Sequence, residues 1–460
     1  MNDTLIPQQT DFMALGPITK CPYSTLKSFL PCWPSPEPFK LTSEQANWFR
    51  HLGQCLLRFY QAQNKLYNAS VRGKAPSWIS RYLDNGKPEH IVELGRAKAF
   101  RGEIPPIIRP DVLSVDEGYT ICELDSVPGG FGLAAQMVNR YNEHGHQLVG
   151  DISVEEGFAM AMEAPKHGMN SSMAIVVSDE SRDYLDEMTW LSNRLRALGY
   201  KVHVAHPRDL SYTEDKVFLK VGINVTQIDT VYRFAELFDH RNISKWELLT
   251  FLAKGKRIRL APTVKPYLEE KLWFALFHHP TLQAYWKGEL GEDFTLLKKV
   301  IPATWILDPT PLPPHAVIPG LNTEQGAVQS WEAIRNASKR LRKLVIKPSG
   351  FSPDAWGSRG VVVGHDVSAE DWSKAVDKAL LAFPETTYIL QEYKSPTRIS
   401  LPAYTEQRDI ENFEGRVRFS PYYFVADGTA TLSAILATVC ASDKKKIHGM
   451  SDAVMTVCAV

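Results

Sequence analysis

The region after residue 170 restricts the fold more than any other part of the sequence. Residues 173–180, "MAIVVSDE", form a continuous apolar run that ends in acidic residues, as expected of a strand buried on both faces. A helical pattern follows at 184–199, and "YKVHVAHPRDL" then reads as a second strand. A strand, a helix and a strand at this spacing predict a βαβ unit with a parallel sheet. We expect a Rossmann-like domain over 171–260, and because Gly-x-Gly-x-x-Gly does not follow its first strand, dinucleotide binding is not expected.

The size and charge of the chain exclude several classes of protein. With 460 residues it exceeds the size at which a single core keeps growing, so we expect two or three domains. Lys and Arg number 52, as do Asp and Glu, so no net charge attracts nucleic acid or an anionic membrane. The sequence shows no secretory signal, and its longest apolar run, "TATLSAILATVCA", is shorter than the roughly 20 residues of a membrane span. We expect a cytoplasmic protein without nucleic-acid or membrane partners.

The cysteines are spread along the chain and show no Cys-x-x-Cys spacing. Neither a structural zinc site nor a disulfide framework is therefore expected. The six cysteines are Cys21, Cys32, Cys55, Cys122, Cys440 and Cys458.

A lysine and a glycine-rich loop in the last third indicate a phosphate site. Residues 330–343 read as a helix, and the strand "LVIKP" after them leads into a loop rich in Gly and Ser that ends at 364. Glycines let backbone N–H groups approach phosphate oxygens, and a fixed lysine supplies a point charge. The alternative is an ordinary hairpin, because the pattern is not that of a P-loop. The candidate phosphate-binding residues are Lys347, Ser349, Gly350, Gly357 and Gly360.

The strands after this loop offer further nucleotide contacts. "YILQEY" ends an apolar run with Gln391, Glu392 and Tyr393, which could meet an adenine edge and a ribose hydroxyl. The alternative is a strand whose end becomes polar at the surface. In "GRVRFSP", Arg418 offers a guanidinium suited to a phosphoryl group, with Arg416 on the same strand face.

An acidic hairpin in the first third indicates a metal site. In "RPDVLSVDEGYTICELDSVPGG" (109–130), Glu123 and Asp125 lie two residues apart and therefore share one face of a strand. Carboxylates are ligands for Mg²⁺, and Asp111 on the preceding strand could complete the set. Arg109 shares the face of Asp111 and could meet a transferring phosphoryl group. The alternative is an edge hairpin with a solvated charged face.

Taken together, these motifs resemble the nucleotide site of the ATP-grasp family. Carboxylates that precede the lysine resemble its circularly permuted branch, which includes glutathionylspermidine synthase-like proteins. That branch carries Arg-x-Asp…Glu-x-Asn…Pro, and "LEEKLWFALFHHP" resembles its segment with a first ATP-contacting lysine, either Lys271 or Lys265. Most of 100–460 takes part in the resemblance. The positions that match the acidic motif are Arg109, Asp111, Glu123, Asp125 and Pro128.

Two departures from this family stand out. Asp125 occupies a position where the family usually has asparagine, which adds a negative charge to the metal site. Residues 1–100 are too short and too rich in Pro for the amidase domain of the bifunctional members, so we expect no hydrolytic half.

The resemblance implies an α/β fold with a permuted ATP-grasp-like nucleotide site and a Rossmann-like (pre-ATP-grasp) domain. It implies an N-terminal region over 1–170 with a Pro-rich arm, helices and the carboxylate hairpin, the Rossmann-like domain over 171–260, and a nucleotide-binding region over 261–460. The resemblance implies that the protein uses ATP and two Mg²⁺ ions.

The implied activity is that of a ligase that joins a small-molecule or peptide carboxylate to an amine through an acyl phosphate, assisted by Arg109 and Arg418. A phosphotransferase or a nucleotide-binding protein without ligation is the alternative on the same fold, and an α/β interaction protein with relic motifs is a third. The identities of the substrates and the oligomeric state stay open.

Overall fold

The computed structural model describes residues 33–166, 172–324, 326–357, 359–405, 409–444 and 453–460. Helices and mixed sheets alternate along this part of the chain, which confirms the expected α/β class. Cys21, Cys32 and residues 1–32 of the expected Pro-rich arm lie outside the described residues. Among the helices that the structure describes, none combines the length and the apolar character that crossing a membrane requires.

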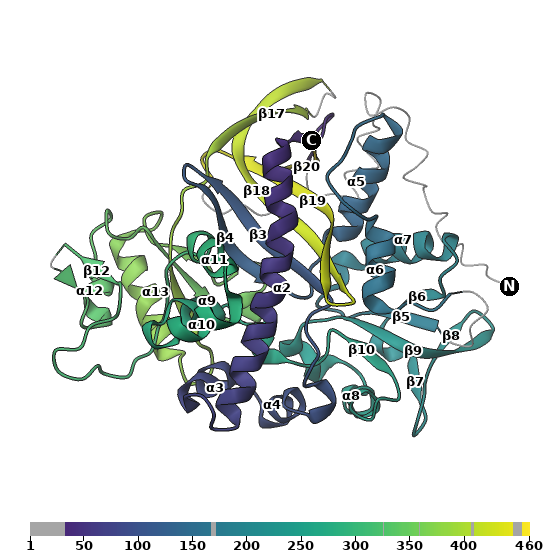
Figure 1. The fold of residues 1–460 in the computed structure, drawn as a ribbon, viewed down its shortest axis with the longest axis horizontal. Coiled ribbons are helices and arrows are strands. Elements are labelled where there is room, and N and C mark those ends of the chain that lie inside the picture. The colour runs from purple at the N-terminus through teal and green to yellow at the C-terminus, as the bar shows by residue number, and fades with distance from the viewer. Residues whose placement is uncertain (1–32, 167–171, 325, 358, 406–408, 445–452) are drawn as a thin grey trace.

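The largest sheet has eight strands and brings distant parts of the sequence together (Figure 1). Its order is β1-β20-β19-β18-β3-β4, with β17 beside β18 and β2 beside β20. β18 is antiparallel to both β19 and β3. Strands from the end of the sequence therefore lie in one sheet with a hairpin from the first third of the sequence. The strands are β1 (Trp33–Pro34), β2 (Phe39–Lys40), β3 (Ile107–Val115), β4 (Gly118–Asp125), β17 (Arg398–Tyr404), β18 (Ile410–Ala426), β19 (Thr429–Ala441) and β20 (Ala453–Ala459).

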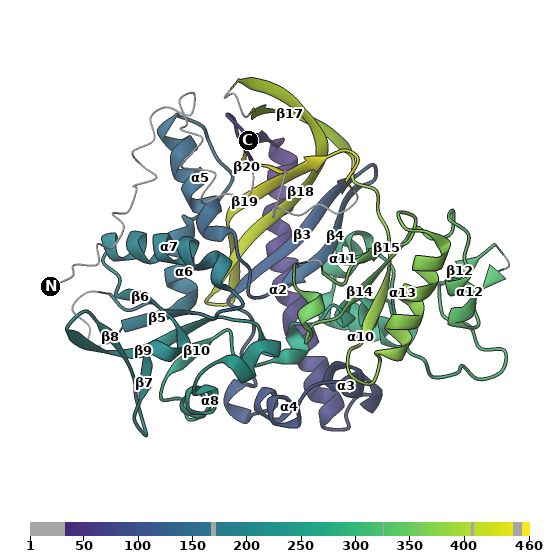
Figure 2. The same cartoon turned by 180° about the vertical axis from the view of Figure 1, so that it is seen from behind.

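Helices cover both faces of this sheet. Helix α2 (Ser43–Val71) crosses one face in Figure 1, and its N-cap Thr42 exchanges hydrogen bonds with Gln45 in a capping box. Its Gly53 lies against the sheet, since a Cβ there would be 2.4 Å from the ring of Tyr423. Helices α5 (Phe131–Glu143) and α6 (Val154–Met162) pack on the opposite face, seen from behind in Figure 2.

The six-stranded sheet contains the predicted βαβ unit. Strand β5 is parallel to both β6 and β9, and β9 is parallel to β10, while β7 and β8 add an antiparallel extension. The two faces of β5 enter different cores, so all its residues are buried. The elements are β5 (Ser172–Val177), α7 (Leu185–Ala197), β6 (Val202–Ala205), β7 (Leu210–Tyr212), β8 (Val217–Val221), β9 (Asn224–Phe234), α8 (Trp246–Lys254) and β10 (Arg259–Ala261).

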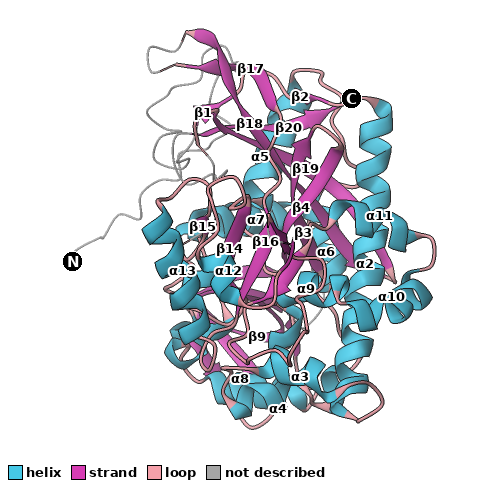
Figure 3. Ribbon diagram, turned by 90° about the vertical axis from the view of Figure 1, so that its left-hand side faces the viewer, coloured by secondary structure: helices cyan, strands magenta, loops and turns pink. Residues whose placement is uncertain are grey.

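A four-stranded antiparallel sheet, ordered β11-β16-β14-β15, carries the predicted phosphate-binding lysine. Figure 3 shows α13 beside its strands, and the Trp372 side chain of that helix is fully buried against them. The elements of this region are β11 (Thr304–Ile306), β12 (Asn322–Thr323), β13 (Gly326–Ala327), α12 (Trp331–Arg335), β14 (Leu344–Pro348), β15 (Val362–Val363), α13 (Ala369–Leu381) and β16 (Tyr388–Glu392).

The helix expected over 330–343 was predicted too long, because α12 ends at Arg335. The chain turns after it, and the buried Arg342 guanidinium donates to the carbonyls of Val367 and Ser368, next to the start of α13. Because of this tertiary contact, the chain around Arg342 does not continue the helix.

Short helices connect the three sheets. All but α4 share the hydrophobic core of α2, whereas Ile91 of α4 belongs to the core of the six-stranded sheet. The three-part division at residues 170 and 260 remains a prediction, although β17 to β20 belong to the same sheet as β3 and β4. The connecting helices are α3 (Ser77–Asp84), α4 (Glu89–Gly95), α9 (Leu272–His278), α10 (Gln283–Leu290) and α11 (Asp293–Val300).

Candidate functional site

The β3–β4 hairpin holds the predicted acidic residues at adjoining positions. Arg109 is opposite Asp125, and Asp111 is opposite Glu123, with a register shift immediately after Asp111. The polar turn at Asp116 and Glu117 lets the two strands pair directly. The hairpin thereby brings one arginine and three carboxylates onto neighbouring positions of the large sheet.

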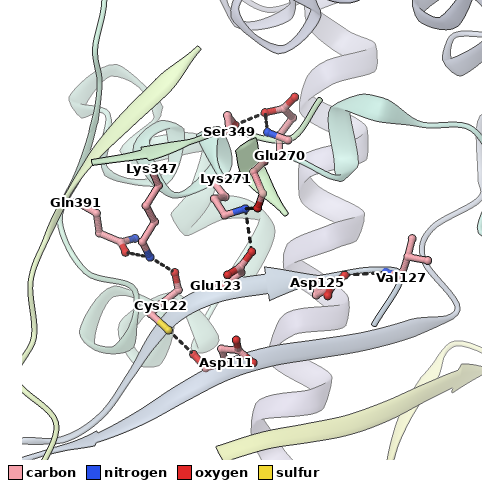
Figure 4. Close-up of polar contacts among 12 residues, drawn as sticks. Asp111, Cys122, Glu123, Asp125, Val127, Glu270, Lys271, Lys347, Ser349 and Gln391 are labelled. Atoms are coloured by element: carbon pink, nitrogen blue, oxygen red, sulfur yellow. Dashed lines mark hydrogen bonds and ion pairs between the residues drawn. The ribbon is translucent and has the colours of Figure 1, made fainter. Parts of the chain in front are cut away.

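Two lysines from other parts of the chain converge on this hairpin (Figure 4). The Nζ atom of Lys271, just before α9, lies 2.8 Å from Glu123 Oε1. The Nζ atom of Lys347, on β14, donates to the Cys122 carbonyl at 2.8 Å and to Gln391 Oε1 at 2.8 Å. Burial alone would raise the pKa of Glu123, but the charges of Lys271 and Lys347 outweigh it and lower that pKa to about 2.

The alternative first lysine, Lys265, does not face this site. Its buried ammonium group donates to Asn64 Oδ1 at 3.0 Å and to the carbonyls of Arg101 and Glu103. Lys265 therefore fastens the helix α2 to the segment before β3. The geometry favours Lys271 as the lysine that meets a nucleotide.

The two predicted catalytic arginines surround Asp111. Arg109 lies 3.5 Å from Asp111 and 3.0 Å from Asp125, while Arg418 on β18 lies 3.0 Å from Asp111 Oδ2. Ser420 donates to Asp111 Oδ1 at 3.0 Å. Both oxygens of Asp111 are thus occupied, and its side chain is only 5% exposed. In this arrangement Asp111 orients the arginines, so its predicted metal role would require these contacts to open.

A cleft with about 530 Å³ of empty space, part of it open to solvent, lies beside Glu123 and Asp125. Lys271 faces it from the segment before α9, and Gly350 and Ser352 face it from the glycine-rich loop. The structure therefore brings the hairpin, one lysine and the loop around one cavity.

Two acidic residues that the sequence motifs did not single out also line the cleft, Glu236 and Glu269. Glu236 follows the end of β9, the edge of a parallel sheet where ligands commonly bind, and this position could have identified it. Burial, together with the charges of Glu269 and Asp125, raises the pKa of Glu236 to about 8. Glu269 forms an ion pair with Arg233, yet burial still raises its pKa.

The lining of the cleft is acidic, but among the described residues its carboxylates do not bring three ligand oxygens close enough together to form a metal-binding group. Four carboxylates line it, and burial raises the pKa of Asp125 as it does for Glu236 and Glu269. A bound cation would stabilise the ionised forms of these carboxylates, and the metal role expected of Glu123 and Asp125 remains a prediction. The four residues are Glu123, Asp125, Glu236 and Glu269.

The start of the glycine-rich loop is held by a carboxylate. The Gly350 N–H donates to Glu270 Oε2 at 2.8 Å, and the Ser349 hydroxyl contacts the same oxygen. A Cβ at residue 350 would be 2.0 Å from the Glu269 carbonyl, so only glycine fits there. Gly357 has a φ of 62°, and the Gly360 N–H donates to the Asp354 carbonyl at 2.9 Å. Neither Gly357 nor Gly360 lines the cleft described above.

The predicted adenine and ribose contacts lie at the end of β16 and immediately after it. Gln391 joins Lys347 to Thr304, with its Nε2 3.3 Å from the threonine Oγ1. Glu392 accepts from Lys394 at 2.9 Å, and the Tyr393 ring packs edge-on against His365. Gln391 thus supports the lysine, whereas the nucleotide contacts expected of Glu392 and Tyr393 remain predictions.

Comparisons with known proteins give a similarity of fold only. No protein-family model matches the sequence, and no curated protein matches it. A glutathione synthetase-like effector from Globodera pallida, solved in its apo form, superposes with a TM-score of 0.53 and 12% identity over 93% of this chain and 90% of that one. A putative gamma-glutamylcysteine synthetase from Methylobacillus flagellatus gives a TM-score of 0.39 and 13% identity over 81% and 84% of the two chains, which is too weak to use. The chain therefore shares the overall fold of a glutathione synthetase-like protein, which is consistent with the expected ATP-grasp-like fold.

Proposed function

We propose that this protein is an ATP- and Mg²⁺-dependent ligase that joins a carboxylate to an amine, with a permuted ATP-grasp-like site. The observation that carries the proposal is the convergence of Lys271 and Lys347 on adjacent residues of β4, beside an acidic cleft. The two lysines are 76 residues apart by their sequence numbers, yet Lys271 pairs with Glu123 and Lys347 donates to the carbonyl of the adjacent Cys122. Two fixed cations beside buried carboxylates suit a polyphosphate that arrives with its metal ions.

Each group has a distinct role in this proposal. Lys271 and Lys347 bind phosphate oxygens, and the loop that begins at Ser349 covers them. Glu123 and Asp125, with Glu236 and Glu269 nearby, would hold Mg²⁺, which neutralises phosphate charge when bound. Asp111 remains a predicted ligand, although the geometry supports its role in orienting Arg109 and Arg418 more directly.

The reaction is a sequence of two transfers. An oxygen of the substrate carboxylate forms a bond to the γ-phosphorus as the bond to ADP breaks, which gives an acyl phosphate. The amine nitrogen then forms a bond to the acyl carbon, and phosphate leaves with the proton that the amine loses. Arg109 and Arg418 stabilise the negative charge of the transferring phosphoryl group, and the lysines keep it in line with the carboxylate.

ATP binding tests the site directly. We expect calorimetric titration of ATP to show binding that Mg²⁺ strengthens, and Lys271→Ala to weaken it by about tenfold or more, which corresponds to about 1.4 kcal/mol. Lys374→Ala is a matched control, because Lys374 is an exposed lysine on α13 that pairs with Glu370. If ATP gives neither heat nor a thermal shift with or without Mg²⁺, the proposed function is wrong.

Product analysis separates ligation from the alternative on the same site. Phosphate released only when a carboxylate and an amine are both present supports the ligase. A stable phosphorylated product formed from one acceptor alone would indicate a phosphotransferase.

A further inference from the structure

A second cluster of ligand-type side chains lies between helices α2 and α11, away from the acidic cleft. His51 and Cys55 are one turn apart on α2, and Asp293 is the first residue of α11. Cys55 Sγ lies 3.4 Å from His51 Nε2, and His51 Nε2 lies 3.6 Å from Asp293 Oδ1. One ligand atom from each residue lies within 4.8 Å of the other two.

These separations match the edges of a tetrahedral coordination shell. With bonds of about 2.0–2.3 Å to nitrogen, oxygen and sulfur, the ligand atoms of a tetrahedral zinc site are about 3.3–3.6 Å apart. The sulfur–nitrogen and nitrogen–oxygen distances given above are close to this range. A metal could therefore be bound with little movement of either helix.

Asp293 is buried and its two carboxylate oxygens face different partners. Its side chain is only 5% exposed, and its Oδ2 atom has no hydrogen bond of acceptable geometry among the described residues. Arg58 Nε lies 2.7 Å from that Oδ2 atom as an ion-pair contact, which leaves Oδ1 directed to His51. Arg58 would hold the carboxylate in place from outside the coordination shell.

The donor set indicates the class of metal. A thiolate, an imidazole and a carboxylate favour Zn²⁺ over Mg²⁺ or Ca²⁺, which prefer oxygen ligands only. Cys55 is buried, whereas the His51 side chain is 53% exposed, so solvent can reach the cluster from the histidine side. Three protein ligands and one position open to water form a complete tetrahedral shell.

We propose that His51, Cys55 and Asp293 form a Zn²⁺ site that joins α2 to the N-terminus of α11. The site is separate from the ATP site, because none of its three ligands lines the acidic cleft. Its effect is on stability, since metal bound only by the folded chain favours that state.

The test uses the full chain after treatment with a chelator. We expect one equivalent of Zn²⁺ to bind and to raise the melting temperature. We expect Co²⁺ to give a thiolate-to-metal charge-transfer band that Cys55→Ser abolishes and Cys122→Ser retains. His51→Ala should weaken Zn²⁺ binding by about tenfold or more, whereas His144→Ala, at an exposed histidine, should leave it unchanged.

His51 makes the test independent of folding. Because its side chain is half exposed, His51→Ala should keep the circular dichroism of the parent and its response to ATP. Zn²⁺ binding that is equally strong in His51→Ala and Cys55→Ser, or no binding of Zn²⁺ by the parent, overturns the proposal. Either result leaves the ATP titration to be judged on its own.

Discussion

The two sides of the acidic cleft hold glutamates of similar burial and opposite behaviour. On the hairpin side, Lys271 and Lys347 overcome the effect of burial and lower the pKa of Glu123 to about 2. On the β9 side, burial and the negative charges of Glu269 and Asp125 raise the pKa of Glu236 to about 8. Burial is common to both sides, so the nearby lysines decide which glutamate is ionised at neutral pH. The cleft is therefore divided into a charged side and a side that holds a proton.

The largest expected effect comes from removing the charge at the hairpin side. Lys347→Ala should weaken Mg²⁺-dependent ATP binding by about tenfold or more and should raise the pKa of Glu123, because one of its two lysine partners is lost. Calorimetry measures the first effect, and a carbon-13 NMR titration of the glutamate carboxyls measures the second. Unchanged ATP affinity in a folded variant would remove Lys347 from the site.

A steric change at the loop should come next in size. Gly350→Ala places a Cβ 2.0 Å from the Glu269 carbonyl, so the loop must move away from the hydrogen bond with Glu270. We expect a loss of about 1–3 kcal/mol in the free energy of unfolding and weaker ATP binding. Urea denaturation provides the measurement, with Gly288→Ala, where a Cβ meets no atom within 4 Å, as the control.

The raised pKa of Glu236, on the β9 side, should appear in the pH dependence of the free energy of unfolding. The pKa of Glu236 is raised on folding from 4.5 to about 8, so the unfolded chain binds fewer protons in this interval. The contribution of Glu236 to stability is therefore complete below pH 4.5 and is lost as pH rises to about 8. Relative to the parent, Glu236→Gln should become more stable as pH rises from 5 to 8.

Denaturation at several pH values checks this expectation, and Mg²⁺ sharpens it. A cation bound in the cleft stabilises ionised Glu236 and should reduce the pH dependence of the parent. A difference between parent and variant that does not change with pH would contradict the division of the cleft into two sides.

The smallest effect is expected from the isosteric replacement Asp125→Asn. Burial raises its pKa, although Arg109 and the N–H of Val127 favour its charged form. Since asparagine is usual at this position in the family that the sequence resembles, Asp125→Asn should preserve the fold and change ATP affinity by less than about threefold. Asp125→Lys should abolish Mg²⁺-dependent binding, and similar titration curves for the two variants would show that the position does not face the metal.

The local parts of the fold could be predicted from sequence, and the contacts between them could not. The run at 173–180 identified a strand of the parallel sheet, and two strand-like segments joined through "DEG" at 116–118 identified the β3–β4 hairpin. Both signals depend on residues that are close in the sequence. The end of α12 was mispredicted, because the buried Arg342 donates to carbonyls of a segment that is distant in the sequence. No local pattern indicates that contact.

The candidate site shows the same limit. The motifs singled out Lys347, Glu123 and Asp125, but Glu236 follows an ordinary strand and acquires its environment only from Glu269 and Asp125 in space. Cysteine spacing likewise gave no sign of the cluster at Cys55, since His51 is a turn away on the same helix and Asp293 comes from a distant one. Residue type and spacing identify candidate ligand residues, whereas the residues that surround them depend on tertiary packing.

The pairing of β18 with β3 has a consequence for how the chain folds during its synthesis. Asp111 on β3 and Arg418 on β18 are 307 residues apart, and their ion pair closes one of the longest loops in the molecule. During synthesis, β3 leaves the ribosome with an open edge long before the strand that covers it, and contacts of such sequence separation form slowly. The arginine pair around Asp111 can assemble only after most of the chain has been made. The β3–β4 hairpin therefore enters its sheet late, and a chain stopped before residue 410 would carry the acidic motif without the strand that pairs with it.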